Sequence, residues 1–419
     1  MEQQKPKMSI LWHSVSPFCA SGYGKVTRYV TNLLSQNGYR VIISAYYGVE
    51  PGQQIVLNPN LIMVGSKIGQ FGIQSSRMYA DMYRTDVSLL HTDFWAFPDF
   101  PRLHPRALLH SPQDSEEYDP ATYEATKQYF SVTTLTEWAK RDFEKHGIKV
   151  DEVIHHGVDT SIFKPLDKKE CRKHFGYPED KFIFGMVSAN NDKEDRKNWS
   201  GTLRAFRHLL DQDPDIGREC RLVLFTDPVN PAGYPIASIA HKLGLDQYVF
   251  LFPSQLFNVG IPDTELNMLY NCFDVHVLCS KREGFGLTIL ESMCSGIPNI
   301  VHNYSSMTEL VRGRGWLVKS LTSGINRIIT PINSEFHIPD TYDLYEKMKR
   351  SYLRPQERDK YSLLSRKYTL QHDWNIIFRE KWIPYLREIG ERLEKHPLSV
   401  IGVSEKKDEM FRSKFQEVV

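Results

Sequence analysis

The chain has 419 residues, and its 52 basic and 51 acidic residues leave a net charge of +1. That balance gives no overall attraction to nucleic acid or to an anionic membrane, so no nucleic-acid partner is predicted. The length exceeds the roughly 250–300 residues at which single hydrophobic cores stop growing, so at least two domains are expected.

Cysteine usage and the lack of a long apolar stretch indicate the cellular compartment in which the protein is found. The six cysteines are scattered, and no two have Cys-x-x-Cys spacing. This usage is typical of a reducing compartment, so the sequence predicts a cytoplasmic protein. No stretch reaches the ~18 consecutive apolar residues that span a bilayer, so no transmembrane segment is predicted. Peripheral contact with a membrane stays compatible with this pattern.

The first 146 residues alternate between strand-like and helix-like patterns. After the first apolar run, for example, Val26, Val30 and Leu33 recur at helical spacing. The predicted strands are Ser9–His13, Arg40–Ala45, Val87–His91, Ala107–His110 and Ser131–Leu135, and the predicted helices are Gly22–Ser35, Ile73–Met82, Pro120–Lys127 and Glu137–His146.

The alternation restarts after a polar stretch around Pro165. Strands are predicted there at Phe182–Val187, Arg221–Phe225, Val249–Phe252, Val275–Leu278 and Asn299–Val301, and helices at Ser200–Leu210, Ala237–Leu243, Glu265–Tyr270 and Leu287–Cys294. Repeated strand–helix alternation predicts an α/β protein with parallel sheets covered by helices on both faces.

These patterns divide the chain into four parts. Two Rossmann-like domains are predicted at 1–165 and 166–372. An aromatic-rich helix interrupted by Pro384 follows at 373–393, and residues 394–419 form a polar tail whose composition is typical of disorder.

The segment from Asp274 to Ile300 carries the clearest sign of a binding site. A predicted strand is followed by the loop Ser280–Gly286, which contains two glycines, and by a helix that begins at Leu287. The first N–H groups of a helix lack partners within it and favour an anion, typically a phosphate. This helix end also lies on the ligand side of a parallel sheet. The segment therefore predicts a phosphate site.

Two acidic residues flank this helix start. Glu283 lies in the loop, and Glu291 follows eight positions later, about two turns on. A carboxylate at the second position can accept hydrogen bonds from paired sugar hydroxyls. The alternative is that both glutamates only complement the positive end of the helix.

Glu283, seven residues and Glu291, with Gly-Phe-Gly between them and Gly-Ile-Pro after them, resemble the signature of glycosyltransferase family 4. That family consists of retaining enzymes of GT-B architecture. The resemblance implies two Rossmann-like domains facing a cleft. The aromatic residues Phe378 and Trp382 need to be buried, so the helix Trp374–Leu393 is predicted to cross back to the N-terminal domain. Other segments match in the expected order along residues 10–390: Ser21–Gly24, His110–Pro112, His156–Asp159, Phe163–Pro165, Arg196–Asn198, Thr308–Val311 and Gly315–Val318.

The resemblance also implies roles for the matching residues. Glu291 would hold the ribose hydroxyls of the nucleotide, and Glu283 would contact the donor sugar near the reacting centre. Arg196 and Lys197 would neutralise the leaving diphosphate, and His110 would position the donor sugar or the reacting hydroxyl. The other implied donor-binding residues are Gly22, Gly24, Gly284, Phe285, Gly286, Leu287 and Thr288.

Several of these residues also have a purely structural explanation. The Asp192–Lys197 segment also fits a solvated charged loop, and it lacks the arginine that the family often has shortly before its Arg-Lys pair. His110 also fits a structural histidine at a strand end, although that position should face the cleft. Gly22 and Gly24 also fit simple helix–sheet packing.

No metal and no cofactor are predicted. The chain has neither a Gly-x-x-x-x-Gly-Lys phosphate loop nor a His-Glu-x-x-His zinc motif. Asp211-Gln212-Asp213 resembles the Asp-x-Asp metal motif of other sugar transferases, but it lies at the polar end of a predicted helix, just before Pro214.

The resulting prediction is a retaining glycosyltransferase that moves a sugar from a UDP- or GDP-sugar to a hydroxyl acceptor. The acceptor partner would be a glycan, a lipid-linked sugar or a protein-linked sugar. It would contact the loops His91–Phe100 and Ser111–Asp119 of the N-terminal domain. The alternatives are a nucleotide-sugar epimerase or hydrolase, and a catalytically silent nucleotide-sugar binding protein.

Overall fold

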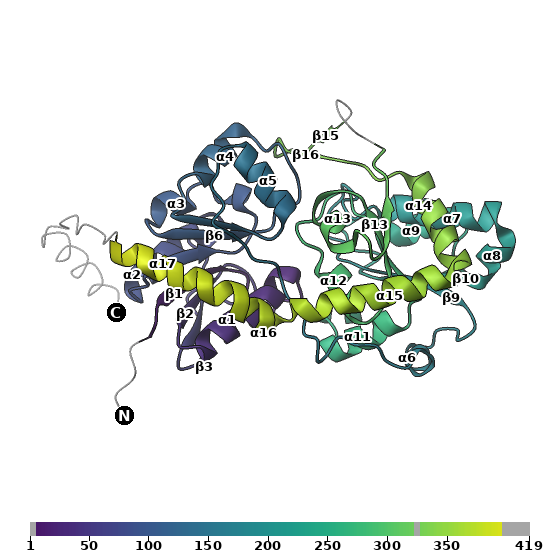
Figure 1. Cartoon of the computed structure of the whole chain (residues 1–419), viewed down its shortest axis with the longest axis horizontal. Helices are drawn as coiled ribbons and strands as arrows, with labels where there is room; N and C mark the ends of the chain where they lie inside the picture. The colour runs from purple at the N-terminus through teal and green to yellow at the C-terminus, as the bar shows by residue number, and fades with distance from the viewer. Residues whose placement is uncertain (1–5, 322–326, 396–419) are drawn as a thin grey trace, which may run out of the picture.

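The computed structural model describes residues 6–321 and 327–395, and each of its two large parallel sheets forms the centre of one domain (Figure 1). The N-terminal sheet has the strand order β3-β4-β2-β1-β5-β6-β7-β8, and the C-terminal sheet has the order β11-β10-β9-β12-β13-β14. Within these sheets only β3 runs antiparallel to its neighbour. The predicted α/β class with two Rossmann-like domains is confirmed.

The N-terminal sheet and its helices follow the predicted strand–helix alternation. Strand residues are buried almost throughout, as parallel strands covered on both faces require. The strands are β1 (Ser9–Ser14), β2 (Arg40–Ala45), β3 (Gln54–Asn58), β4 (Leu61–Gly65), β5 (Val87–Leu90), β6 (Ala107–Ser111), β7 (Ser131–Thr134) and β8 (Glu152–Val153), and the helices are α1 (Gly22–Gln36), α2 (Ile73–Met82), α3 (Phe100–Leu103), α4 (Pro120–Thr126) and α5 (Glu137–Lys145).

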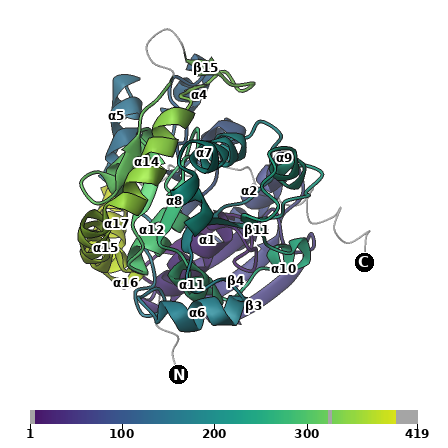
Figure 2. The same cartoon turned by 90° about the vertical axis from the view of Figure 1, so that its right-hand side faces the viewer.

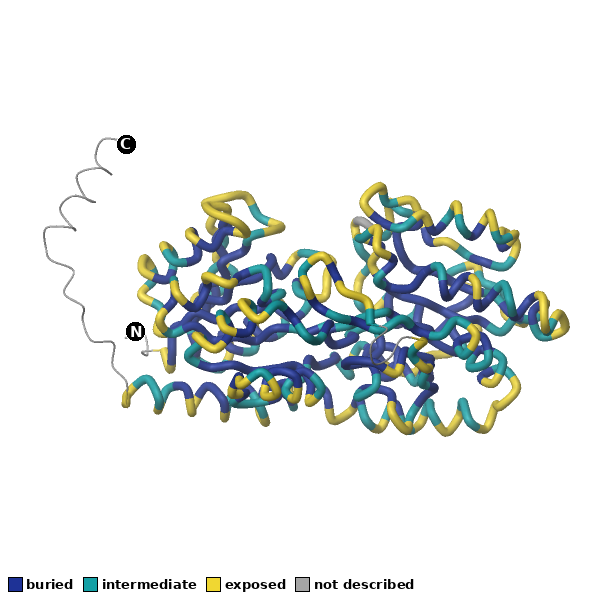
Figure 3. The backbone as a smooth tube through the Cα atoms, turned by 90° about the horizontal axis from the view of Figure 1, so that it is seen from above, coloured by how far each residue is buried: buried dark blue, intermediate teal, exposed yellow. Residues whose placement is uncertain are grey.

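The C-terminal domain repeats this plan (Figure 1). Its strands are β9 (Phe182–Val187), β10 (Cys220–Phe225), β11 (Val249–Leu251), β12 (Val275–Leu278), β13 (Asn299–His302) and β14 (Trp316–Val318). Its helices are α6 (Lys168–Phe175), α7 (Trp199–Gln212), α8 (Pro214–Glu219), α9 (Ile236–Lys242), α10 (Ser254–Val259), α11 (Asp263–Asn271), α12 (Leu287–Cys294), α13 (Ser305–Val311), α14 (Thr341–Leu353) and α15 (Pro355–Thr369). Buried residues run through the interior of both domains (Figure 3).

Both sheets reverse their strand order at one central strand pair. In the N-terminal sheet the reversal lies between β1 and β5, and in the C-terminal sheet it lies between β9 and β12. Such a reversal opens a crevice at the carboxyl ends of the two strands, where open α/β sheets bind ligands. The loops after these four strands are therefore the places to look for a site.

The C-terminal segment crosses back to the N-terminal domain, as predicted. After α15 it continues as α16 (Trp374–Ile377), the π-helical turn Phe378–Trp382 and α17 (Ile383–Lys395) along one side of both domains (Figures 1 and 2). Its aromatic residues join the core of the first sheet together with Trp12. Pro384 does not interrupt the helix as expected. Proline lacks an N–H, and the wider π-helical turn just before it lets the helix continue.

A second connection between the domains is the hairpin of β15 (Ile328–Ile329) and β16 (Glu335–Phe336). The Glu335 N–H donates to the Glu116 carbonyl at 2.7 Å, and the Glu116 N–H donates to the Glu335 carbonyl at 3.1 Å. Ile332 packs against an apolar cluster of the N-terminal domain. Figure 1 shows this hairpin above the gap between the two domains.

None of the helices in residues 6–321 and 327–395 is long and apolar enough to cross a membrane. All six cysteines lie in the described part of the chain, and each is a free thiol or thiolate.

Candidate functional site

The start of α12 presents a row of free backbone donors at the crevice of the C-terminal sheet. Gly286 immediately precedes the helix with a φ of 100°, a left-handed conformation that glycine adopts without strain. No described residue accepts a hydrogen bond from the N–H groups of residues 284–288. These donors, with the positive end of the helix dipole, form an anion-binding surface.

Glu283 connects this surface to the predicted cations. Its carboxylate forms an ion pair with the Lys197 ammonium, and the Ser280 hydroxyl donates to it at 3.3 Å. The Ser305 and Ser306 hydroxyls donate to the Glu283 carbonyl at 3.0 and 2.7 Å, which fixes the loop. Glu283, Lys197 and the start of α12 therefore form one cluster, as the sequence predicted.

Arg196 and Lys197 follow β9, so they face the crevice from its other strand. The Lys281 N–H donates to the Arg196 carbonyl at 2.8 Å and joins the two loops. Burial and the Arg196 charge lower the pKa of Lys197, while Glu283 opposes that shift. The pKa of Arg196 is raised, because neighbouring acids, Glu283 first, outweigh the effect of burial. Lys197 is buried and Arg196 is half-buried beside Asp192, whereas Lys193 and Glu194 of the same loop are exposed.

The loop that carries Arg196 and Lys197 is fixed by capping interactions at the start of α7. Asp195 and Asn198 have φ values of 57° and 59°, in the left-handed region that Asp and Asn tolerate better than most residues. The Asp195 carboxylate accepts hydrogen bonds from the Trp199 N–H at 2.6 Å and from the Ser200 hydroxyl. This capping of α7 fixes the backbone on both sides of Arg196 and Lys197.

Glu291 lies inside α12 and is only 3% exposed. The Tyr270 hydroxyl donates to its carboxylate at 2.9 Å, and the Lys25 ammonium of the N-terminal domain forms an ion pair with it. Lys25 also pairs with Asp263 at 2.9 Å. The two carboxylates outweigh burial and raise the pKa of Lys25. A ribose at Glu291 would therefore meet Lys25 as well.

The sequence analysis did not identify Lys25. A usable signal was present, because Lys25 lies in the first turn of α1, where a cation opposes the positive end of the helix dipole. A lysine in that position is better explained by a contact elsewhere, here with Glu291 and Asp263 across the domain boundary.

Gly22, Gly284 and Phe285 lie at close contacts between the two domains, whereas Gly24 serves its own turn. A Cβ atom on Gly284 would lie 2.5 Å from Pro112, and one on Gly22 would lie 3.4 Å from Leu287. A Cβ atom on Gly24 would lie 2.3 Å from the Cys19 carbonyl oxygen, so Gly24 is required by its own turn. The Phe285 ring packs on His156, with ring centroids 4.9 Å apart.

His110 is the last residue but one of β6 and is 1% exposed, so it does not present an open face to the cleft as the sequence suggested. Its ring lies 5.3 Å from that of His91 and 5.9 Å from that of His156, measured between centroids. Burial, followed by the effect of His91, holds the pKa of His110 well below its usual range. His110 is therefore neutral near pH 7.

The hydrogen bonds of these histidines fix their tautomers. The Thr133 hydroxyl donates to the Leu109 carbonyl, so it accepts from Nδ1 of His110 at 3.0 Å. Nδ1 of His91 donates to the His110 carbonyl at 2.8 Å. Each Nε2 atom therefore carries a lone pair, and that of His91 is buried without a hydrogen-bond partner among the described residues.

Two clusters of described residues bring potential metal-ligand atoms within 4.8 Å of one another: His91 with His110 and His156, and Glu117 with Asp142 and His146. In the second cluster the His146 ring is already hydrogen-bonded to the Asp142 carbonyl and to Glu117. The Asp-x-Asp segment lies away from both, with Asp211 paired to Arg207 and Asp213 paired to Lys349.

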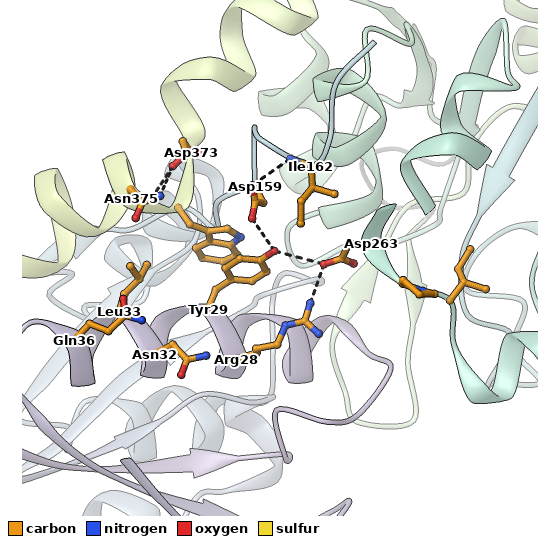
Figure 4. Close-up of a pocket in the computed structure, with 13 residues that line it drawn as sticks. Arg28, Tyr29, Asn32, Leu33, Gln36, Asp159, Ile162, Asp263, Asp373 and Asn375 are labelled. Atoms are coloured by element: carbon orange, nitrogen blue, oxygen red, sulfur yellow. Dashed lines mark hydrogen bonds and ion pairs between the residues drawn. The ribbon is translucent and has the colours of Figure 1, made fainter. Parts of the chain in front are cut away.

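A surface hollow of about 610 Å³ lies at the domain junction, where α1, α11 and α16 meet (Figure 4). The Tyr29 hydroxyl donates to Asp159 at 3.2 Å and lies 3.5 Å from Asp263, which also pairs with Arg28. The hollow therefore borders the Lys25–Asp263 contact without containing the helix start of α12.

The fold defined by these two domains is that of the GT-B glycosyltransferases. Sucrose-phosphate synthase from Thermosynechococcus elongatus superposes with a TM-score of 0.72 and 17% identity over 92% of this chain and all of that one. Anabaena HepE, solved in complex with UDP-glucose, superposes with a TM-score of 0.67 and 14% identity over 91% of this chain and all of that one.

The sequence of the C-terminal domain matches a known family. Residues 167–323 match the family described as glycosyl transferases group 1. A D-inositol 3-phosphate glycosyltransferase from Nocardioides sp. (strain ATCC BAA-499 / JS614) is 30% identical over 176 residues. That match spans 40% of this chain and 37% of the relative, so the similarity covers well under half of either protein.

Proposed function

We propose that this chain is a retaining glycosyltransferase that moves a hexose from a nucleoside diphosphate sugar to a hydroxyl acceptor. The observation that carries the proposal is the crevice between β9 and β12. There the free N–H groups at the start of α12, the cations Arg196 and Lys197, and Glu283 converge. Free amides and fixed cations suit a diphosphate, and a carboxylate beside them suits sugar hydroxyls.

Each group has a defined task in this reaction. The amides of residues 284–288 bind a donor phosphate, and Glu291 with Lys25 binds the ribose. As the sugar–phosphate bond breaks, negative charge grows on the leaving diphosphate, and Arg196 and Lys197 stabilise it. His110 accepts a hydrogen bond from a sugar hydroxyl through its free Nε2 and does not act as a base, because burial disfavours the charged ring that would form if it took the proton.

Two other functions use the same donor site. A nucleotide-sugar epimerase or hydrolase would isomerise or release the sugar, and a silent binding protein would only hold the donor. Product analysis separates them from a transferase. The protein is incubated with UDP-glucose and with GDP-mannose, each with and without a mixture of sugar acceptors. Chromatography then detects a new glycoside, an isomerised donor, free sugar, or unchanged donor.

Replacing Glu291 with alanine should weaken binding of UDP or GDP by about tenfold, because a charged hydrogen-bond acceptor for the ribose is lost. Isothermal titration calorimetry measures this change. The matching 2′,3′-dideoxynucleotide should bind the wild type weakly and lose little further affinity in the variant. Equal losses for both nucleotides would show that Glu291 does not bind the ribose.

Treatment with EDTA should leave transfer activity within about twofold, because fixed protein cations and a helix end replace the divalent ion that other transferases place on the diphosphate. The initial rate of nucleotide release is measured before and after chelation. Abolished activity that Mn²⁺ or Mg²⁺ restores would overturn the metal-free assignment.

A further inference from the structure

The crevice of the N-terminal sheet contains a carboxylate that the proposed donor site does not use. Asp93 follows β5 and Tyr23 follows β1, the two strands at which the strand order reverses. The Tyr23 hydroxyl donates to one oxygen of Asp93 at 2.7 Å. No described residue is hydrogen-bonded to the other oxygen of Asp93. An acceptor oxygen therefore remains free at the position where such sheets bind ligands.

The charges around Asp93 connect it to the proposed donor site. Across the cleft, Arg196 and Arg282 are close enough to act on Asp93 electrostatically, and within its own domain so is Asp114. At Asp114 the hydroxyls of Tyr118 and Ser115 both donate to the same oxygen, at 3.2 and 3.1 Å, and Arg282 lies 3.8 Å from that oxygen. Asp93 differs in its place, because it follows a strand at the reversal and keeps a free oxygen near the cations assigned to the diphosphate.

We propose that Asp93 binds the hydroxyl group of the acceptor that attacks the donor sugar, and that the acceptor ring entering this crevice is uncharged. The proposal rests on the proposed glycosyltransferase function. The attacking oxygen forms a bond to the anomeric carbon, the bond from that carbon to the diphosphate oxygen breaks, and the acceptor proton passes to the released diphosphate. Asp93 orients the hydroxyl through its free oxygen, held by Tyr23.

The preference for an uncharged ring follows from the local carboxylates. Asp93 and Asp114 are close enough to interact electrostatically, and an acceptor phosphate or carboxylate at Asp93 would be repelled by both. A hydroxyl donates a hydrogen bond to Asp93 without that penalty. Neutral sugars and cyclitols are therefore the expected class, in contrast to the phosphorylated inositol named for the Nocardioides relative.

Burial and Asp114 raise the pKa of Asp93 to about 6, while Tyr23, Arg196 and Arg282 oppose the rise. The carboxylate is ionised above that pH and accepts the hydroxyl hydrogen bond. Acceptor-stimulated turnover should therefore fall as the pH drops through about 6. The titratable and charged groups that act on Asp93 from the packed elements are Tyr23, Tyr46, Asp114, Tyr118, Arg196 and Arg282.

The test compares Asp93→Asn with Asp81→Asn, a matched change of an exposed residue in α2, outside the loops expected to contact the acceptor. Release of UDP or GDP from UDP-glucose or GDP-mannose is measured with glucose, mannose or myo-inositol as probe acceptors, and with glucose 6-phosphate and inositol phosphate as charged probes. Titration of UDP or GDP onto each variant gives donor-site affinity separately.

Asp93→Asn should lower acceptor-stimulated release by about 30-fold, remove the pH dependence near 6, and leave nucleotide affinity within about twofold. Asp81→Asn should behave as the wild type. Unchanged stimulation, or a parallel loss of nucleotide affinity, would overturn the role of Asp93. If only the phosphorylated probes stimulated nucleotide release, or if no probe did, the proposal that the acceptor is uncharged would be overturned. Failure of the wild type to bind either nucleotide would instead reject the proposed function itself.

Discussion

Replacing Arg196 and Lys197 together with alanine should lower turnover at saturating donor by about 100-fold or more. Both side chains follow β9 and lie beside the start of α12, where the diphosphate is expected. Charge on that diphosphate grows as the sugar leaves, so the cations stabilise the transition state more than the bound donor. Donor affinity should change less than turnover. Steady-state kinetics with varied donor concentration separates the two effects.

The single variants Arg196→Ala and Lys197→Ala measure how much each cation contributes to this loss of turnover. Lys197 is the cation that pairs with Glu283, so Lys197→Ala also leaves that carboxylate without its partner. Lys197→Arg and Arg196→Lys should rescue only part of the activity, because a planar fork and a point charge place their donors differently. Lys193→Ala, an exposed change in the same loop, is the matched control and should keep wild-type kinetics.

Near-normal turnover in the double variant would show that the diphosphate is neutralised elsewhere. Arg282 follows β12 and lies 3.8 Å from Asp114 and 3.6 Å from Glu194, so it is the next cation to test. A large loss of donor affinity with unchanged turnover would instead mean that the pair binds the ground state and the transition state equally well.

Most of the sheet framework could be predicted from the sequence because buried parallel strands are nearly continuous apolar runs. Arg40–Ala45 and Phe182–Val187 have the predicted bounds, and so does the helix Leu287–Cys294. β3 was not predicted, because it is a half-exposed edge strand with little apolar contrast. α15 was missed for a similar reason, since few of its side chains are buried.

The donor side of the site could be predicted from one short segment of the sequence, whereas the acceptor side could not. Glu283, Gly284–Gly286 and Glu291 lie within one strand–loop–helix unit, so their spacing fixes their relation. Lys25 meets Glu291, and Tyr23 meets Asp93, only because separate loops converge at the strand reversals. Contacts between residues 266 or 70 positions apart leave no local pattern in the sequence.

Trp382→Ala should lower the free energy of unfolding by about 3–5 kcal/mol, the usual cost of truncating a large buried aromatic residue. Trp382 is 1% exposed and packs with Trp12 of β1, with ring centroids 6.0 Å apart. Its ring also meets His110 edge-on at 4.7 Å. The helix that crosses back from the C-terminal domain thus completes the core of the first sheet and supports the predicted sugar-binding histidine.

Urea unfolding followed by far-ultraviolet circular dichroism measures this loss. Arg379→Ala is the matched control, because Arg379 lies in the same π-helical turn but its side chain is 66% exposed and pairs only with Glu380 among the described residues. A decrease confined to Trp382→Ala would show that the crossing segment is part of the N-terminal core. Equal stability of both variants would show that the first domain is stable without this contact, and the link from Trp382 to His110 would then lose its structural basis.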